Sequence, residues 1–125
     1  MNTENTQKLF EKYPKIFADK DKPCSQSLVC FGFECGDGWY SIVDELCAKL
    51  QTISDKSDFQ VTAFQVKEKF GGLRFYINGG NDAVFTAINE AEKRSYATCE
   101  HCGSTQDVSQ TKTGWIQTVC KECRK

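Results

Sequence analysis

Two pairs of cysteines near the end of the chain constrain its fold more than any other feature. Cys99 and Cys102 form one C-x2-C pair, and Cys120 and Cys123 form a second pair after 17 intervening residues. Two residues between paired cysteines let the backbone turn so that both sulfurs face one point, and zinc takes four such ligands in a tetrahedron. This spacing is typical of zinc ribbons, so we predict a zinc-ribbon module over residues 99–125. The alternative is a set of reduced cysteines packed without metal.

Metal is also expected to stabilise this module, because residues 103–119 carry few apolar side chains. Four cysteine ligands leave no open coordination position, which indicates a structural site rather than a catalytic one. His101 lies inside the first cysteine pair and could replace one of the ligands. Because four thiolates already suffice, we expect His101 to be a bystander.

Four other cysteines, Cys24, Cys30, Cys35 and Cys47, match no common metal-binding spacing. Free cysteine packs as a small apolar residue, so we expect four buried thiols. A second metal site and a catalytic thiol are the alternatives. A catalytic thiol would lack a base, because His101 is the only histidine in the sequence.

Hydrophobic periodicity predicts the elements that precede the ribbon. Helical spacing of apolar residues covers 39–53 and 82–96, and a shorter helix over 6–13 stops before a proline. Residues 19–27 form a polar connector, and 28–35 form a strand or an irregular packing segment. Strands over 59–70 and 73–77 pair as a hairpin. The sequence therefore predicts an α+β domain over 1–98, with a small antiparallel sheet packed against two to three helices.

The predicted hairpin gathers positive charge on one face. With Gly71 and Gly72 as a two-residue turn, Phe70 pairs with Leu73, Lys69 with Arg74, Glu68 with Phe75 and Lys67 with Tyr76. The core face then holds Phe64, Val66, Phe70, Leu73, Phe75 and Ile77, and the other face holds Gln65, Lys67, Lys69, Arg74 and Tyr76. Opposed like charges cost stability unless an anion neutralises them, so Lys67, Lys69, Arg74 and Tyr76 are a candidate site for a phosphate-bearing ligand. A protein carboxylate as the neutraliser, or a solvated cationic face, is the alternative.

Glu68 breaks the alternation of this hairpin, because it falls among the apolar residues of the core face. We expect Glu68 at the edge of the sheet, or paired inward with a cation or a helix N-terminus. A catalytic acid is a further, less favoured alternative.

The stretch ECGDGWY (34–40) opens the second predicted helix with two glycines. Free N–H groups at a helix start favour anions, and glycines let a ligand approach the backbone closely. A second candidate ligand site therefore comprises Gly36, Asp37, Gly38 and Trp39. The alternative is an ordinary capped helix start with Trp39 in the core.

Charge and hydropathy limit the classes of partner. A net charge of −1 disfavours a protein that holds long nucleic acid through its phosphates. No run of about 18 apolar residues predicts a membrane span, and the polar N-terminal stretch lacks the apolar centre of a signal peptide. We therefore expect a cytoplasmic protein, in which clustered thiols stay reduced and bind metal.

Three stretches together resemble a family of small phage and prophage proteins of unknown function: ECGDGWYSIVDELC, VKEKFGGLRFYING and CEHCG…GWIQTVCKEC. The resemblance covers roughly residues 28–123. It implies a protein that acts in the cytoplasm of an infected bacterium. Small phage proteins of this size often block host processes by binding something, including the nucleotide signals of antiviral defence.

Three functions are compatible with these features. The first is a non-enzymatic protein that sequesters a nucleotide-like or other anionic small molecule, and here we expect an oligomer whose subunits share the pocket. The second is a zinc-ribbon adaptor for a host protein or, less favoured, nucleic acid, anchored by Trp115 at the ribbon tip. The third is a hydrolase of a phosphorylated substrate. It ranks last because the chain has one histidine, a closed zinc site and no recognisable nucleophile–base pair.

Overall fold

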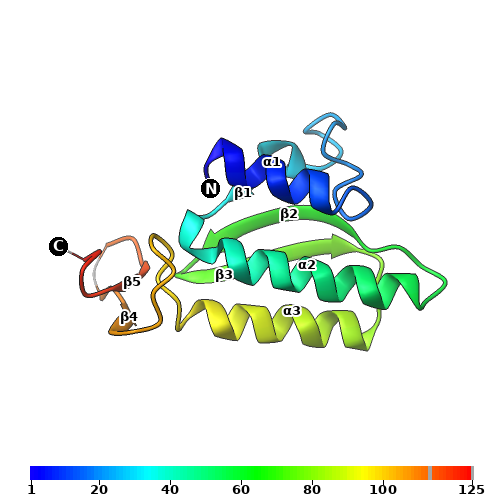
Figure 1. The fold of residues 1–125 in the computed structure, drawn as a ribbon. Helices are drawn as coiled ribbons and strands as arrows, with labels where there is room; N and C mark the ends of the chain where they lie inside the picture. The colour runs from blue at the N-terminus through cyan, green and yellow to red at the C-terminus, as the bar shows by residue number, and fades with distance from the viewer. Residues whose placement is uncertain (113, 125) are drawn as a thin grey trace.

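The computed structural model describes residues 1–112 and 114–124, which form a three-stranded sheet, three α-helices and a small two-stranded ribbon (Figure 1). The helices are α1 (Thr3–Lys12), α2 (Tyr40–Asp55) and α3 (Asp82–Ser95), and the two 3-10 turns are η1 (Leu28–Phe31) and η2 (Asp37–Trp39). The strands are β1 (Phe33–Glu34), β2 (Thr62–Lys69), β3 (Gly72–Asn78), β4 (Val108–Gln110) and β5 (Thr118–Cys120). This is the α+β fold with a C-terminal ribbon that the sequence predicts.

Two of the helices begin at asparagine caps. The Asn2 side chain accepts a hydrogen bond from the N–H of Asn5, and the Asn81 side chain accepts one from the N–H of Val84. The Asn2 cap explains why α1 starts earlier than the predicted range of 6–13. Helix α2 starts at Tyr40, directly after the η2 turn, and runs slightly beyond the predicted range of 39–53.

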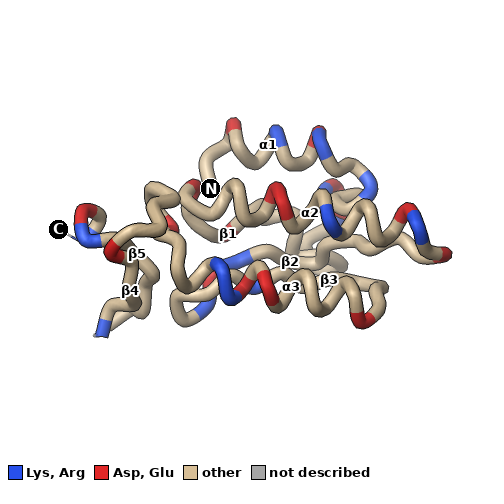
Figure 2. The backbone as a smooth tube through the Cα atoms, turned by 60° about the horizontal axis from the view of Figure 1, so that its bottom comes forward, with Lys and Arg blue, Asp and Glu red and all other residues tan. Residues whose placement is uncertain are grey.

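The sheet places apolar side chains against the helices and polar ones on its other face. Strand β2 is central, with β1 parallel to it on one side and β3 antiparallel on the other, so the sheet is mixed. Val66, Leu73 and Phe75 are buried in a core cluster that residues of all three helices share. Helix α2 lies between α1 and α3 in both views of the molecule (Figures 1 and 2).

The predicted register of the β2–β3 hairpin is wrong, although its division into faces is largely right. Phe70 and Gly71 form the turn, and both have the positive φ that a type I′ turn requires, 55° and 83°. Lys67 therefore lies opposite Arg74, in place of the predicted Lys69. Because side chains alternate with a period of two, this shift by two positions leaves the strand residues on their predicted faces. Phe70 and Phe64 are the exceptions. Phe70 leaves the core and is 66% exposed at the turn. Phe64 lies at an irregularity of β2 outside the core cluster, and Ala63 is buried there instead.

The register follows from the separate roles of the two glycines. Gly71 has the positive φ of the turn, and its N–H donates a hydrogen bond of 2.7 Å to Glu68 Oε2. A Cβ on Gly72 would lie 2.3 Å from the Tyr96 hydroxyl, so Gly72 is required for the packing of Tyr96. Phe70 consequently takes the left-handed conformation, which costs a non-glycine residue roughly 1–2 kcal/mol.

Two hydrophobic clusters of very different size stabilise the fold. The larger one fills the body of the molecule (residues 1–98) and includes contacts between the rings of Phe10, Phe17 and Phe33, with centroids 5.2–5.5 Å apart. The smaller one, in the cysteine ribbon (residues 99–124), consists of Cys99, Val119 and Cys120 with partly buried neighbours. The ribbon therefore needs a source of stability other than apolar burial.

Candidate functional site

The four cysteines of the ribbon meet at one point, as predicted. The Sγ atoms of Cys99, Cys102, Cys120 and Cys123 all lie within 4.8 Å of one another. Sulfur ligands about 2.3 Å from a tetrahedral ion lie about 3.8 Å apart, and the Cys102 and Cys120 sulfurs are 3.6 Å apart. This donor set fits a metal ion closed off by four thiolates.

Local backbone geometry brings the first cysteine pair into position. Gly103 has a φ of 81°, which turns the chain after Cys102. The N–H of Cys99 donates to the Ser104 carbonyl at 2.8 Å, and the N–H of Gly103 donates to the Cys99 carbonyl at 2.9 Å. His101 lies exposed in this turn and is not one of the four clustered ligands.

The ribbon packs against the body at two glycines, Gly36 and Gly38, which we call the glycine seat. The N–H of Gly38 donates to the Glu100 carbonyl at 2.7 Å, and the N–H of Gly36 donates to Glu100 Oε2 at 2.9 Å. A Cβ on Gly38 would lie 2.1 Å from the Cys99 carbonyl oxygen, and one on Gly36 would lie 2.3 Å from that of Glu100. The glycines therefore admit the backbone of the first cysteine pair.

This contact occupies the groups on which the second predicted ligand site relied. Glu100 takes the N–H groups of both glycines, and Asp37 accepts hydrogen bonds from Asn2 and Asn5. Trp39 is fully buried, and its indole N–H donates to the Thr98 carbonyl at 2.9 Å. The alternative expectation is a capped helix start with Trp39 in the core. Trp39 is in the core as that alternative expects, but neither η2 nor α2 has a side-chain cap.

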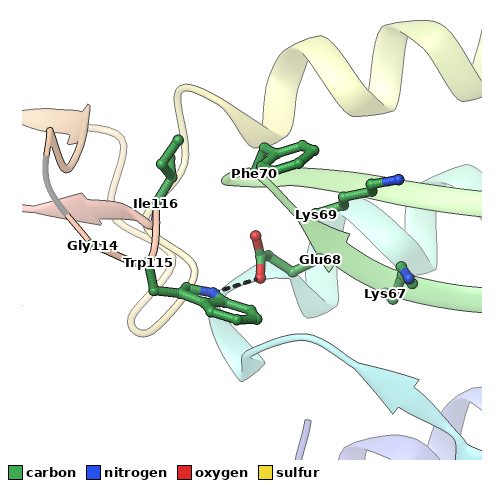
Figure 3. Close-up of a pocket in the computed structure, with 7 residues that line it drawn as sticks. All are labelled: Lys67, Glu68, Lys69, Phe70, Gly114, Trp115 and Ile116. Atoms are coloured by element: carbon green, nitrogen blue, oxygen red, sulfur yellow. Dashed lines mark hydrogen bonds between the residues drawn. The ribbon is translucent and has the colours of Figure 1, made fainter.

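A second contact joins the ribbon to the hairpin and leaves a cleft between them. The Thr118 hydroxyl donates to the Gly71 carbonyl at the hairpin turn. Beside it lies a cleft of about 350 Å³, the hairpin–ribbon cleft, within the size range of small-molecule sites. Its walls come from the end of β2 and from the ribbon tip (Figure 3), namely Lys67, Glu68, Lys69, Phe70, Gly114, Trp115 and Ile116.

Aromatic side chains dominate the exposed surface of this cleft. Trp115 is 77% exposed and Phe70 is 66% exposed, while Ile116 is 37% exposed. Figure 3 shows the Trp115 ring extending from the ribbon towards β2. The sequence singled out Trp115 as a tip residue but placed Phe70 in the core. Only the observed turn at Phe70 and Gly71 brings the two aromatic residues to the same cleft.

The predicted cationic residues divide into two groups. Arg74 forms an ion pair with Glu92 of α3, and this hydrogen bond raises the pKa of Arg74. A protein carboxylate thus neutralises Arg74, as one of the alternatives expected. Tyr76 lies on the same face of the sheet, 41% exposed, but outside the cleft.

Lys67 and Lys69 belong to the cleft and have no ion pair among the described residues. Glu34 lies beside Lys67 in the β1–β2 register, but its carboxylate accepts a hydrogen bond of 3.4 Å from Gln65 instead. The Lys69 ammonium lies 5.7 Å from the centroid of the Phe70 ring. Both ammonium groups are therefore available to an anion.

Glu68 connects the two walls of the cleft. Its Oε2 accepts from the N–H of Gly71 at 2.7 Å, and its Oε1 accepts from the indole N–H of Trp115 at 3.2 Å, drawn dashed in Figure 3. The sequence predicted Glu68 at the edge of the sheet, or paired inward with a cation or a helix N-terminus, with a catalytic acid as a less favoured alternative. Its observed partners are two N–H groups, one of them from the ribbon, which no spacing in the sequence could indicate.

The four upstream cysteines do not form a second metal cluster in the described part of the chain. Cys24 and Cys30 are joined by a disulfide, so the prediction of free thiols is wrong for this pair. Cys35 and Cys47 are buried free thiols as predicted. Burial raises the pKa of Cys35 to about 12 and that of Cys47 well above its ordinary value, so neither is a reactive thiolate at neutral pH.

The charge distribution agrees with the modest net charge. Figure 2 shows basic and acidic residues interspersed along α1 and α2, without a stripe of one sign. Within the described residues, no helix is both long and apolar enough to cross a membrane.

Comparison with protein families, curated proteins and solved structures finds no match for this chain.

Proposed function

We propose that this chain is a non-enzymatic binding protein that sequesters a nucleotide-like anionic small molecule in the hairpin–ribbon cleft. The observation that carries the proposal is the combination in the cleft wall of two exposed aromatic rings, Phe70 and Trp115, with two lysines that form no ion pair within the described part of the chain. Nucleobases stack on aromatic side chains, and ammonium groups bind phosphates. A nucleotide carries both of these chemical features.

We further propose that the ion held by the four cysteines is zinc. Four thiolates in a compact cluster favour zinc over the hard cations, which prefer oxygen ligands. The ion would have a structural role, because four protein ligands leave no position for substrate. Its contribution to binding is indirect, since it folds the ribbon that carries Trp115.

The resemblance to small phage proteins suggests the biological setting. We propose that the chain acts in the cytoplasm of an infected bacterium, where sequestration of a nucleotide signal would counter an antiviral defence. Binding without turnover fits the buried Cys35 and Cys47 thiols, whose pKa values are raised by burial. Hydrolysis of a phosphorylated substrate ranks behind binding, because the sequence has one histidine, a closed set of four cysteine ligands and no recognisable nucleophile–base pair.

Calorimetric titration of the metal-loaded protein with a panel of nucleoside mono-, di- and triphosphates tests this function. We expect stoichiometric binding of at least one nucleotide without product formation. Replacing both Lys67 and Lys69 with alanine should weaken binding about 30-fold, if each lost contact contributes about 1 kcal/mol. The matched control replaces the exposed Lys15 and Lys56, which lie outside the cleft, and should bind as the wild type does.

Two results would contradict the proposal. One is the absence of heat and of thermal stabilisation with every nucleotide in the panel. The other is an equal loss of affinity in the two double-lysine variants, which would indicate a general charge effect rather than a site.

A second function, adaptor binding to a host protein, is favoured by one observation. Trp115, Ile116 and Phe70 place exposed apolar surface on both walls of the cleft, and such residues often anchor protein interfaces. A pull-down from bacterial lysate, compared between the wild type and Trp115→Ala, distinguishes this function. A partner that is retained by the wild type and lost by the variant, with no nucleotide bound, would replace the first proposal with this one.

A further inference from the structure

We propose that the hairpin–ribbon cleft selects free guanine nucleotides, with Glu68 recognising the base. This inference rests on the proposed function, because it names the ligand class of the same cleft. Glu68 supplies the only carboxylate in the cleft wall formed by the described residues. In a cleft that otherwise offers cations and aromatic rings, this carboxylate is the group that would accept hydrogen bonds from a ligand.

The carboxylate of Glu68 is held in a fixed orientation from both walls. Gly71 donates its backbone N–H at 2.7 Å from the hairpin side, and Trp115 donates its indole N–H at 3.2 Å from the ribbon side. A carboxylate offers about four lone-pair sites, so both oxygens retain acceptor capacity after these two bonds. No cation pairs with Glu68 among the described residues. The group therefore attracts N–H donors and repels phosphate.

Guanine is the nucleobase whose edge best matches such an acceptor. It presents two adjacent donors, the N1–H and the exocyclic amino group, which can meet the two oxygens of one carboxylate. Adenine and cytosine place a ring-nitrogen acceptor beside their amino group, and uracil flanks its N–H with two carbonyls. In each of these bases an acceptor would face the carboxylate. We therefore expect discrimination of about tenfold or more, as for other bidentate contacts with base edges.

The lysines of the cleft fit the other end of the same ligand. Because side chains alternate along a strand, Lys67 and Lys69 project from the opposite side of β2 to Glu68. Figure 3 shows the two lysines further from the ribbon than the pair formed by Glu68 and Trp115. The end of the cleft where Glu68 would accept the N–H groups of the base is thus separated from the end where the lysines would bind phosphate. Phe70 and Trp115 supply aromatic surface. A nucleotide has its base edge and phosphates at opposite ends.

Calorimetric titrations of the metal-loaded protein with GMP, IMP, AMP and UMP test the inference. These ligands carry the same phosphate, and IMP differs from GMP by the missing amino group alone. We expect GMP to bind most tightly, IMP next, and AMP and UMP most weakly, with GMP at least about tenfold tighter than AMP. Glu68→Gln should lower the affinity for GMP to that for AMP and leave AMP binding unchanged.

Glu34→Gln is the matched control, because it removes the same charge from an exposed neighbour on β1 outside the cleft. It should retain the preference for GMP. Metal content and melting temperature verify that each variant is folded. If Glu68→Gln does not fold, the ranking of the four nucleotides by the wild type still decides the question.

The inference and the proposed function fail in different ways. If no nucleotide binds, the proposed function falls and the inference falls with it. If nucleotides bind but GMP and AMP bind equally, or if Glu68→Gln keeps the preference for GMP, the inference alone is overturned. Tighter binding of a guanosine pentaribonucleotide than of GMP would overturn the assignment to a free nucleotide.

Discussion

The body and the cysteine ribbon are stabilised by different means, and the candidate cleft needs both. In the body, a continuous cluster of buried side chains joins all three helices to the sheet. In the ribbon, the buried cluster consists of Val119 and two of the four metal ligands themselves, Cys99 and Cys120. One wall of the cleft, with Phe70, belongs to the first region, and the other wall, with Trp115, belongs to the second. Binding should therefore depend on the region that cannot fold by apolar burial alone.

Removal of the metal should have the largest effect and should separate the two regions. Metal binding contributes about 10–16 kcal/mol in zinc-finger peptides, so the apo ribbon should unfold while the body remains folded. We expect helical circular dichroism to persist, while the Trp115 fluorescence changes and nucleotide binding disappears. Cooperative loss of the helices on chelation would show that the body depends on the ribbon, and an unchanged ribbon would contradict its dependence on metal.

A substitution that creates a cavity in the body should have the next largest effect on stability and should leave metal binding intact. Leu50 is fully buried, and Leu50→Ala should lower the free energy of unfolding by about 2–5 kcal/mol. Phe85 is 51% exposed, so Phe85→Ala, a larger truncation at the surface, should cost much less. Urea denaturation with a parallel zinc assay measures both. A loss of metal stoichiometry in folded Leu50→Ala would contradict the separation of the two regions.

Substitution at the glycine seat should have the smallest effect and should test the joint between the regions. The Cβ of Gly38→Ala would lie 2.1 Å from the Cys99 carbonyl oxygen, and we expect a cost of about 1–3 kcal/mol as the ribbon shifts. The Trp39 indole N–H, bonded to Thr98, should then exchange faster with solvent. Gly79→Ala is the control, because its φ of 81° imposes strain of about 1–2 kcal/mol without a close contact. Equal indole exchange in both variants would mean that the seat does not hold the ribbon.

Local patterns predicted the parts of the fold that local physics determines. The spacing of Cys99, Cys102, Cys120 and Cys123 predicted the cluster. Two cysteines separated by two residues can bind the same ion, so the pairs are visible in the sequence. The periodicity over 82–96 predicted α3, whose Asn81 cap is encoded beside it. The cationic face of the hairpin was predicted despite the wrong register, because a shift of two positions preserves the faces.

Long-range contacts determined what the sequence could not indicate. The hairpin turn includes Phe70, and Gly72 lies in β3, where the close packing of Tyr96 leaves no space for a Cβ. The sequence predicted a ligand site at Gly36 and Gly38. Their N–H groups instead donate hydrogen bonds to Glu100, which lies 62 residues beyond Gly38 along the chain. The cleft itself joins Phe70 to Trp115, and no local pattern connects these two positions.

Nitrogen-15 NMR of the two tryptophan indoles during a GMP titration tests the central claim most directly. The indole N–H of Trp115 lies in the cleft, bonded to Glu68, and that of Trp39 lies buried behind the glycine seat, bonded to Thr98. The account predicts that GMP shifts the Trp115 signal in a saturable manner and leaves the Trp39 signal in place. An unmoved Trp115 signal, or a shift confined to Trp39, would contradict a ligand site in the hairpin–ribbon cleft.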